Sequence, residues 1–191
     1  MSYRVLVIPE DFRKDQYVLE PILTKMFESV GRKAKVIVCR DPLLRGVSQA
    51  LDWDRIQEII VRYRAMIDCF LLVVDRDGKA TRRKALDGLE KQAAAALGPG
   101  KRFLAENAWQ EVEVWLLAGH ELPSDWAWKD VRAHENPKET YYLPFAQSRG
   151  VASEPAEGRG LLAREAASKY RRIRKLCPEL GDLEQRLTAL P

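Results

Sequence analysis

One apolar run that ends in two carboxylates decides the fold: Cys69-Phe70-Leu71-Leu72-Val73-Val74-Asp75-Arg76-Asp77-Gly78-Lys79. A short apolar run before such a polar turn predicts a strand that is buried on both faces. Alternation along a strand places Asp75 and Asp77 on the same side, and Gly78 permits a turn directly after them. Ionised carboxylates in such a place repel each other unless a metal, a cation or solvent compensates them. The run therefore indicates either a metal site or an ordinary Asp-Gly turn.

The composition is that of a globular domain. The chain has 191 residues, of which 46% are hydrophobic and 31% charged, so disorder is not the default expectation. The three cysteines form no CxxC motif and no cluster with histidine, which argues against structural zinc. The apolar run near the N-terminus is too short for a signal peptide, and no stretch approaches the roughly eighteen apolar residues of a membrane span. We therefore expect a cytoplasmic protein that does not enter a membrane.

Apolar runs alternate with segments of helical period along the first 120 residues, which is typical of βαβ units. Strands are expected at 5–8, 35–39, 69–74 and 101–105, and helices at about 15–30, 52–63, 81–97 and 109–118, with Asp15 as the cap of the first helix. Residues 121–160 show no sustained period, and 161–191 predict two C-terminal helices packed on the core. The expected fold class is α/β, a compact, mainly parallel four-stranded sheet flanked by helices, in a single domain.

Acidic residues follow two of these strands. Glu10 and Asp11 come directly after the first strand, and the Asp75–Asp77 pair ends the third. Because ligands collect at the carboxyl ends of parallel strands, neighbouring strands would bring these carboxylates to one edge of the sheet. Oxygen ligands point to Mg²⁺ or Mn²⁺. Glu111 or Glu113 on the expected short helix supplies a third acidic element.

Positive charge is concentrated near the C-terminus. The net charge is +4, and 159–175 contain seven basic residues against one acid, which favours phosphate contact over a merely solvated helix face. Another basic group follows the acidic strand end, where it could hold a substrate phosphate near a metal. The nucleic-acid-binding candidates are Lys79, Arg82, Arg83, Lys138, Lys169, Arg171, Arg172 and Arg174.

A strand that ends in Glu and a later strand that ends in Asp-x-Asp, within a parallel α/β domain, resemble the Toprim domain of topoisomerases, bacterial primases and certain nucleases. More narrowly, 113–119, with the sequence EVWLLAG, resembles the Glu-x-Trp-Leu-Leu-Ala-Asp hallmark of a group of small prokaryotic Toprim-like proteins. The segments 136–139 and 170–180 are similar to that group too. Two positions depart from the pattern: Gly119 replaces the final Asp of the hallmark, and Asp11 stands where Toprim proteins usually have Gly.

The resemblance implies a Mg²⁺-dependent nuclease acting on DNA or RNA. It makes Asp75 and Asp77 metal ligands, Glu10 a metal ligand or general acid/base, and Glu113 an auxiliary acidic residue. It also implies an ABC-type ATPase partner in a phage-defence system, and a homo-oligomer is compatible with it. The alternative is a non-catalytic Toprim-like scaffold that binds nucleic acid or the ATPase, with the aromatic residues of 123–160 as its contact surface or, more simply, as packing. A phosphoacceptor receiver domain and a haloacid-dehalogenase phosphatase fit less well, because the further motifs of each are missing from the sequence.

Overall fold

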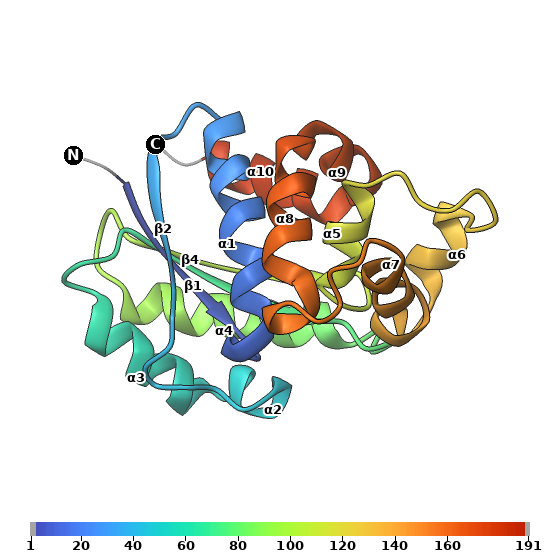
Figure 1. Cartoon of the computed structure of the whole chain (residues 1–191). Helices are drawn as coiled ribbons and strands as arrows, with labels where there is room; N and C mark the ends of the chain where they lie inside the picture. The colour runs from blue at the N-terminus through green and yellow to red at the C-terminus, as the bar shows by residue number, and fades with distance from the viewer. Residues whose placement is uncertain (1–2, 190–191) are drawn as a thin grey trace.

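Four parallel strands form one sheet in the computed structural model, which describes residues 3–189 (Figure 1). The strands are β1 (Tyr3–Pro9), β2 (Ala34–Val38), β3 (Cys69–Asp75) and β4 (Arg102–Ala108), in the order β2-β1-β3-β4. β3 lies between β1 and β4, with Val5 opposite Cys69 and Cys69 opposite Arg102. The expected α/β class with a four-stranded parallel sheet is confirmed.

Helices cover both faces of the sheet and form a three-layer arrangement (Figure 1). The long helices between the strands are α1 (Phe12–Ser29), α3 (Trp53–Tyr63) and α4 (Arg82–Ala96), with the short α2 (Val47–Ala50) before α3. After β4 come α5 (Glu113–Ala118), α6 (Trp128–Ala133), the π-helical turn η1 (Lys138–Tyr142), α7 (Leu143–Ser148), the 3-10 turn η2 (Pro155–Gly158), α8 (Arg159–Ser168), α9 (Tyr170–Leu176) and α10 (Pro178–Thr188). Residues 190 and 191, at the end of the expected C-terminal helical segment 161–191, lie outside the described part of the chain.

Strand alternation divides the core into two clusters. Val5, Val7 and Leu71 point to the face that α1, α5 and the C-terminal helices cover, whereas Leu6 and Phe70 point to the face of α3 and α4. All of these side chains have at most 2% of their surface exposed. Because both faces are buried, the central strands must be apolar at every position, which is why the run before Asp75 shows no alternation.

Side chains from two helices cover the open edge of β4. The backbone N–H of Ala105 donates to Glu90 at 2.7 Å, and its carbonyl accepts from Arg83 at 2.8 Å and from Arg186 at 3.0 Å. Glu106 pairs with both arginines. These bonds satisfy backbone groups that would otherwise be free to pair with another strand.

Two local expectations are corrected by the structure. Asp11, not Asp15, caps α1, since its side chain accepts the N–H of Arg13, whereas Asp15 lies inside the first turn and accepts the N–H of Asp11 at 3.1 Å. α5 begins at Glu113 rather than near residue 109, because Gln110 adopts a left-handed conformation with φ 71°. Within residues 3–189, no helix combines the length and apolar character that crossing a bilayer requires.

Candidate metal centre

Three carboxylates meet at the carboxyl edge of the sheet. Asp75 ends β3, Asp77 lies in the turn that follows, and Glu111 lies in the turn between β4 and α5. One ligand oxygen from each lies within 4.8 Å of the other two. Oxygens around an octahedral Mg²⁺ are about 3.0 Å apart when adjacent and about 4.2 Å apart when opposite, so the three side chains would have to draw together to hold the ion.

Each of the three carboxylates has one oxygen fixed by a protein donor. Asp75 Oδ1 accepts the N–H of Val112 at 2.9 Å, and Glu111 Oε2 accepts the N–H of Lys138 at 2.7 Å. Asp77 Oδ2 accepts from Arg82 Nη2 at 3.3 Å. The second oxygen of each has no hydrogen-bond partner among the described residues. Such outer partners orient a carboxylate while leaving an oxygen for a cation, so the donor set fits an oxygen-binding divalent ion.

Gln110 holds the turn that carries Asp77. Its backbone carbonyl accepts the N–H groups of Arg76 at 2.8 Å and Asp77 at 3.2 Å, and its side-chain oxygen accepts the N–H of Gly78 at 2.8 Å. Gln110 is itself buried and has a positive φ, as does Asp77 with φ 49°. Two non-glycine residues in the left-handed region at one site store strain that surrounding contacts must offset. Nothing in the sequence signals these three hydrogen bonds to Gln110, because a glutamine rarely adopts such a conformation.

Glu10 lies beside the three carboxylates but outside their group. Its Oε2 accepts the backbone N–H of Asp75 at 3.0 Å, which ties the end of β1 to the end of β3. Burial raises the pKa of Glu10. The hydrogen bond from Asp75 lowers this pKa, and the nearby Asp77 charge raises it. Burial and then the charges of Glu10 and Glu113 raise the pKa of Asp75 well above its usual range. The cluster therefore favours bound protons or a cation in this place.

Glu111 and Glu113 have different roles. Burial raises the pKa of Glu111 to about 7, with a further contribution from Glu113. Glu113 points to the protein interior, where its Oε1 accepts from Arg159 Nε at 2.9 Å and Nη2 at 2.6 Å. Of the predicted site residues, the structure brings Asp75 and Asp77 together with Glu111, places Glu10 next to them, and engages Glu113 in a buried ion pair. The sequence left open whether Glu111 or Glu113 supplies the third acidic element, and the structure places Glu111 there.

Four of the predicted nucleic-acid-binding residues lie near the acidic cluster. Arg82 contacts Asp77, Lys79 follows in the same loop, and Arg83 occupies the next position on α4. Arg83 also pairs with Glu106 at 3.3 Å. The fourth, Lys138, contacts Glu111 through its backbone N–H, whereas its Nζ pairs with Glu139 at 3.0 Å.

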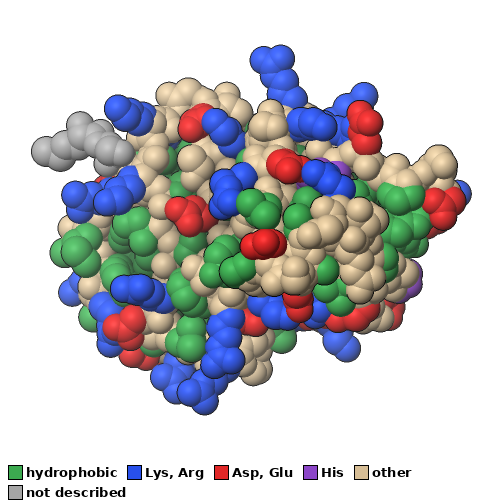
Figure 2. All heavy atoms as spheres, viewed as in Figure 1, with side chains coloured by type: hydrophobic (Ala, Val, Ile, Leu, Met, Phe, Trp, Pro, Cys, Tyr) green, Lys and Arg blue, Asp and Glu red, His purple; other side chains and the backbone are tan. Residues whose placement is uncertain are grey.

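The basic residues of 169–174 lie away from the acidic cluster, beside the last turn of α1. Lys169, Arg171 and Arg172 line a cavity together with the last turn of α1, roughly 20 Å along that helix from the acidic cluster. Arg174 pairs with Glu184 at 2.6 Å. On the face that Figure 2 shows, basic side chains are interspersed with acidic ones instead of forming one continuous patch. The structure thus does not bring this segment to the candidate metal centre.

The aromatic residues of 123–160 contribute mainly to packing. Tyr142 and Phe145 are buried in the core, and Trp126 packs edge-on against Tyr141 at 5.0 Å between ring centroids. Trp128 is partly buried against the same cluster. These aromatic side chains thus contribute to packing, and a role of the segment as a partner surface stays a prediction.

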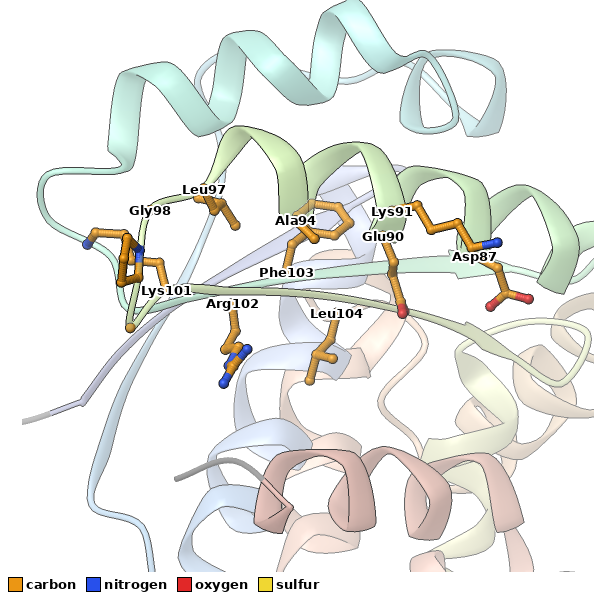
Figure 3. Close-up of a pocket in the computed structure, with 12 residues that line it drawn as sticks. Asp87, Glu90, Lys91, Ala94, Leu97, Gly98, Lys101, Arg102, Phe103 and Leu104 are labelled. Atoms are coloured by element: carbon orange, nitrogen blue, oxygen red, sulfur yellow. The ribbon is translucent and has the colours of Figure 1, made fainter.

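A cavity of about 770 Å³ lies between α4 and β4 (Figure 3). Its lining mixes Asp87, Glu90, Lys91, Lys101 and Arg102 with apolar side chains, and it reaches the Gly98–Gly100 turn at the opposite end of the sheet from Asp75. None of the predicted site residues lines it. This cavity is therefore separate from the candidate metal centre, and its volume does not mark the site of the proposed reaction.

Comparison of the chain with models of known families, with curated proteins and with solved structures gives no match in any of the three.

Proposed function

We propose that this protein is a Mg²⁺-dependent, nuclease-like Toprim protein that acts on phosphodiesters of DNA or RNA. The observation that carries the proposal is the group formed by Asp75, Asp77 and Glu111, in which each carboxylate has one anchored and one unpartnered oxygen among the described residues. Its place at the carboxyl ends of β3 and β4, beside Glu10 at the end of β1, supports a ligand site. The Toprim assignment rests on the resemblance of the sequence.

A bound Mg²⁺ would stabilise charge on a phosphoryl oxygen and lower the pKa of a water nucleophile. Asp75, Asp77 and Glu111 would hold the ion. Glu10 has a raised pKa and an Oε1 without a hydrogen-bond partner in the described chain, so it suits the role of general acid/base beside the reacting phosphate. Arg82 fixes Asp77 and adds a positive charge next to the cluster.

Cleavage of labelled single- and double-stranded DNA and RNA, with Mg²⁺ or with EDTA, tests the activity. We expect divalent-dependent cleavage by the wild type and its loss in Asp75→Asn and in Asp77→Asn, with unchanged circular dichroism. Cleavage that survives both changes would contradict the mechanism. If the wild type binds nucleic acid but does not cut it, alone or with an ATPase encoded beside it, the scaffold function replaces this proposal.

Metal binding can be measured separately from cleavage. Electron paramagnetic resonance of free Mn²⁺ gives the affinity. We expect Glu111→Gln to weaken it about tenfold or more, because a neutral amide replaces one of the three carboxylate ligands. Glu20→Gln on the exposed side of α1 is the matched control and should bind as the wild type does. Equal affinities for Glu111→Gln and the control would remove Glu111 from the site.

A further inference from the structure

A second cavity, of about 300 Å³, opens next to the acidic cluster. It lies between the loop after β3, the first turn of α4, the end of β4, α6 and the start of α10. Five basic side chains and three acidic ones line it: Arg76, Lys79, Arg82, Arg83 and Arg132, with Glu106, Glu179 and Asp182. The lining is therefore positive overall, beside a cluster that is strongly negative.

Ion pairs within the lining leave two of the basic groups available. Arg83 pairs with Glu106 at 3.3 Å, and Arg132 pairs with Glu179 at 2.7 Å. Among residues 3–189, neither Arg76 nor Lys79 has a carboxylate within ion-pair distance. These two charges are free to meet an anion that enters the cavity.

Arg82 contributes an unsatisfied donor to the cavity lining. Its side chain is 8% exposed, and its Nη2 contacts Asp77, but its buried Nε has no hydrogen-bond partner within the described residues. A buried donor on a charged group without an acceptor is unfavourable, because the group has lost its water and gained no partner. Arg82 also lines this cavity, so its guanidinium group lies beside any acceptor bound there.

Trp109 gives the cavity a flat, partly exposed wall. The guanidinium carbon of Arg76 lies 3.8 Å from the centre of the indole ring, and that of Arg132 lies 5.2 Å from it. Stacking on an aromatic ring restrains a guanidinium, so less entropy is lost when it donates to an anion. Trp109 has 36% of its surface exposed and lines the cavity.

We propose that this cavity binds a phosphate group of a nucleotide or nucleic-acid strand through Arg76, Lys79 and Arg82. Planar guanidinium groups and an ammonium group are the side chains that recognise phosphate most strongly. This inference deepens the proposed nuclease function and rests on it for its biological meaning. Because Arg82 also contacts Asp77, the cavity would hold a phosphate neighbouring the one that reacts at the acidic cluster.

Phosphate binding is tested in EDTA, so that neither metal nor cleavage is involved. Inorganic phosphate is titrated at constant ionic strength against chloride, and ¹H–¹⁵N spectra follow the arginine Nε–H signals. We expect a saturable shift of the Arg82 signal by phosphate but not by chloride. Arg76→Gln and Lys79→Gln should each weaken binding about fivefold to tenfold, since each removes one charged donor. The control Arg64→Gln, an exposed residue at the end of α3, should leave it unchanged.

Two further ligands identify the source of the phosphate. A trinucleotide with a 5′-phosphate that binds more tightly than its 5′-hydroxyl form would place a strand end in the cavity, and equal binding of both would place an internal phosphate there. A shift that does not saturate by about 50 mM phosphate, or equal affinities for the wild type, Arg76→Gln and Lys79→Gln, would overturn the proposal. Neither of these results depends on cleavage. A cavity that does not bind phosphate is therefore distinguished from a protein that does not cleave nucleic acid.

Discussion

Arg159 donates two hydrogen bonds to a single oxygen of Glu113, and the arginine side chain has no exposed surface. Its Nη1 also binds the carboxylate of Glu157 and the carbonyl of Ala156, and its guanidinium lies 4.7 Å from the ring centre of Tyr142. One buried cation thus joins α5, η1, η2 and the start of α8. These hydrogen bonds hold the Glu113 carboxylate out of the group of candidate metal ligands, although its charge still contributes to the raised pKa of Asp75.

Removing one partner of this pair should destabilise the protein strongly. We expect Arg159→Met to lower the free energy of unfolding by about 3–5 kcal/mol, because it leaves the Glu113 carboxylate buried without its partner. The double variant Glu113→Leu/Arg159→Met should recover part of the loss, since no uncompensated charge remains. Urea unfolding followed by circular dichroism measures both. A double variant less stable than Arg159→Met would contradict this account.

The close approach of α5 and α8 should exclude any side chain at position 119. A Cβ added to Gly119 would lie 2.4 Å from the Cβ of Ala166 and 2.5 Å from its Cα. We expect Gly119→Ala to destabilise the protein by about 1–3 kcal/mol through overpacking, and Gly119→Asp to cost more. Gly88 on α4 has open space around it, so Gly88→Ala should instead stabilise by up to about 1 kcal/mol. The difference between the two alanine variants in thermal unfolding is the measurement, and equal midpoints would refute it.

Stability should fall as the pH rises through the range set by Asp15. Burial raises the pKa of Asp15 to about 8, above the value of about 3.9 in an unfolded chain. The native state therefore keeps a proton that the unfolded state loses, and this lowers the free energy of unfolding progressively between about pH 4 and pH 8. Asp15→Asn should match the wild type near pH 4 and exceed it by about 5 kcal/mol at pH 8, since one pKa unit corresponds to about 1.4 kcal/mol.

Urea unfolding in EDTA across this range tests the expectation for Asp15. Asp54→Asn, at an exposed position of α3, is the control and should follow the wild type at each pH. A constant difference between Asp15→Asn and the wild type across the whole range would show that the carboxyl group is ionised in the native protein.

The hydrogen bonds to Gln110 should control the local order of the turn that carries Asp77. Gln110→Ala removes the acceptor of the Gly78 N–H and keeps the positive φ, so we expect the Gly78 amide to exchange at least about tenfold faster. Gln110→Gly also removes the acceptor but tolerates the backbone conformation, so it should be more stable than Gln110→Ala by about 0.5–1 kcal/mol. Hydrogen exchange of Gly78 and thermal unfolding measure the two effects. Unchanged exchange of the Gly78 amide in both variants would show that the Gln110 side chain does not hold the turn.

The sequence alone determined the fold class of this protein. Runs that are apolar at every position, separated by segments of helical period, require strands covered on both faces, and such strands are parallel and joined by helices. The same logic placed Glu10 and Asp75 at neighbouring strand ends, where the structure joins them through a hydrogen bond of 3.0 Å. These features follow from local patterns of a few residues.

Only the tertiary structure decided which of two glutamates faces the aspartates. Glu111 and Glu113 are two positions apart and therefore point in different directions. The turn held by Gln110 directs Glu111 to Asp75 and Asp77, and Arg159, 46 residues away in the sequence, draws Glu113 into the interior. A positive φ at a glutamine and a partner that far along the chain leave no local signal, because each is stabilised by packing that exists only once the chain has folded.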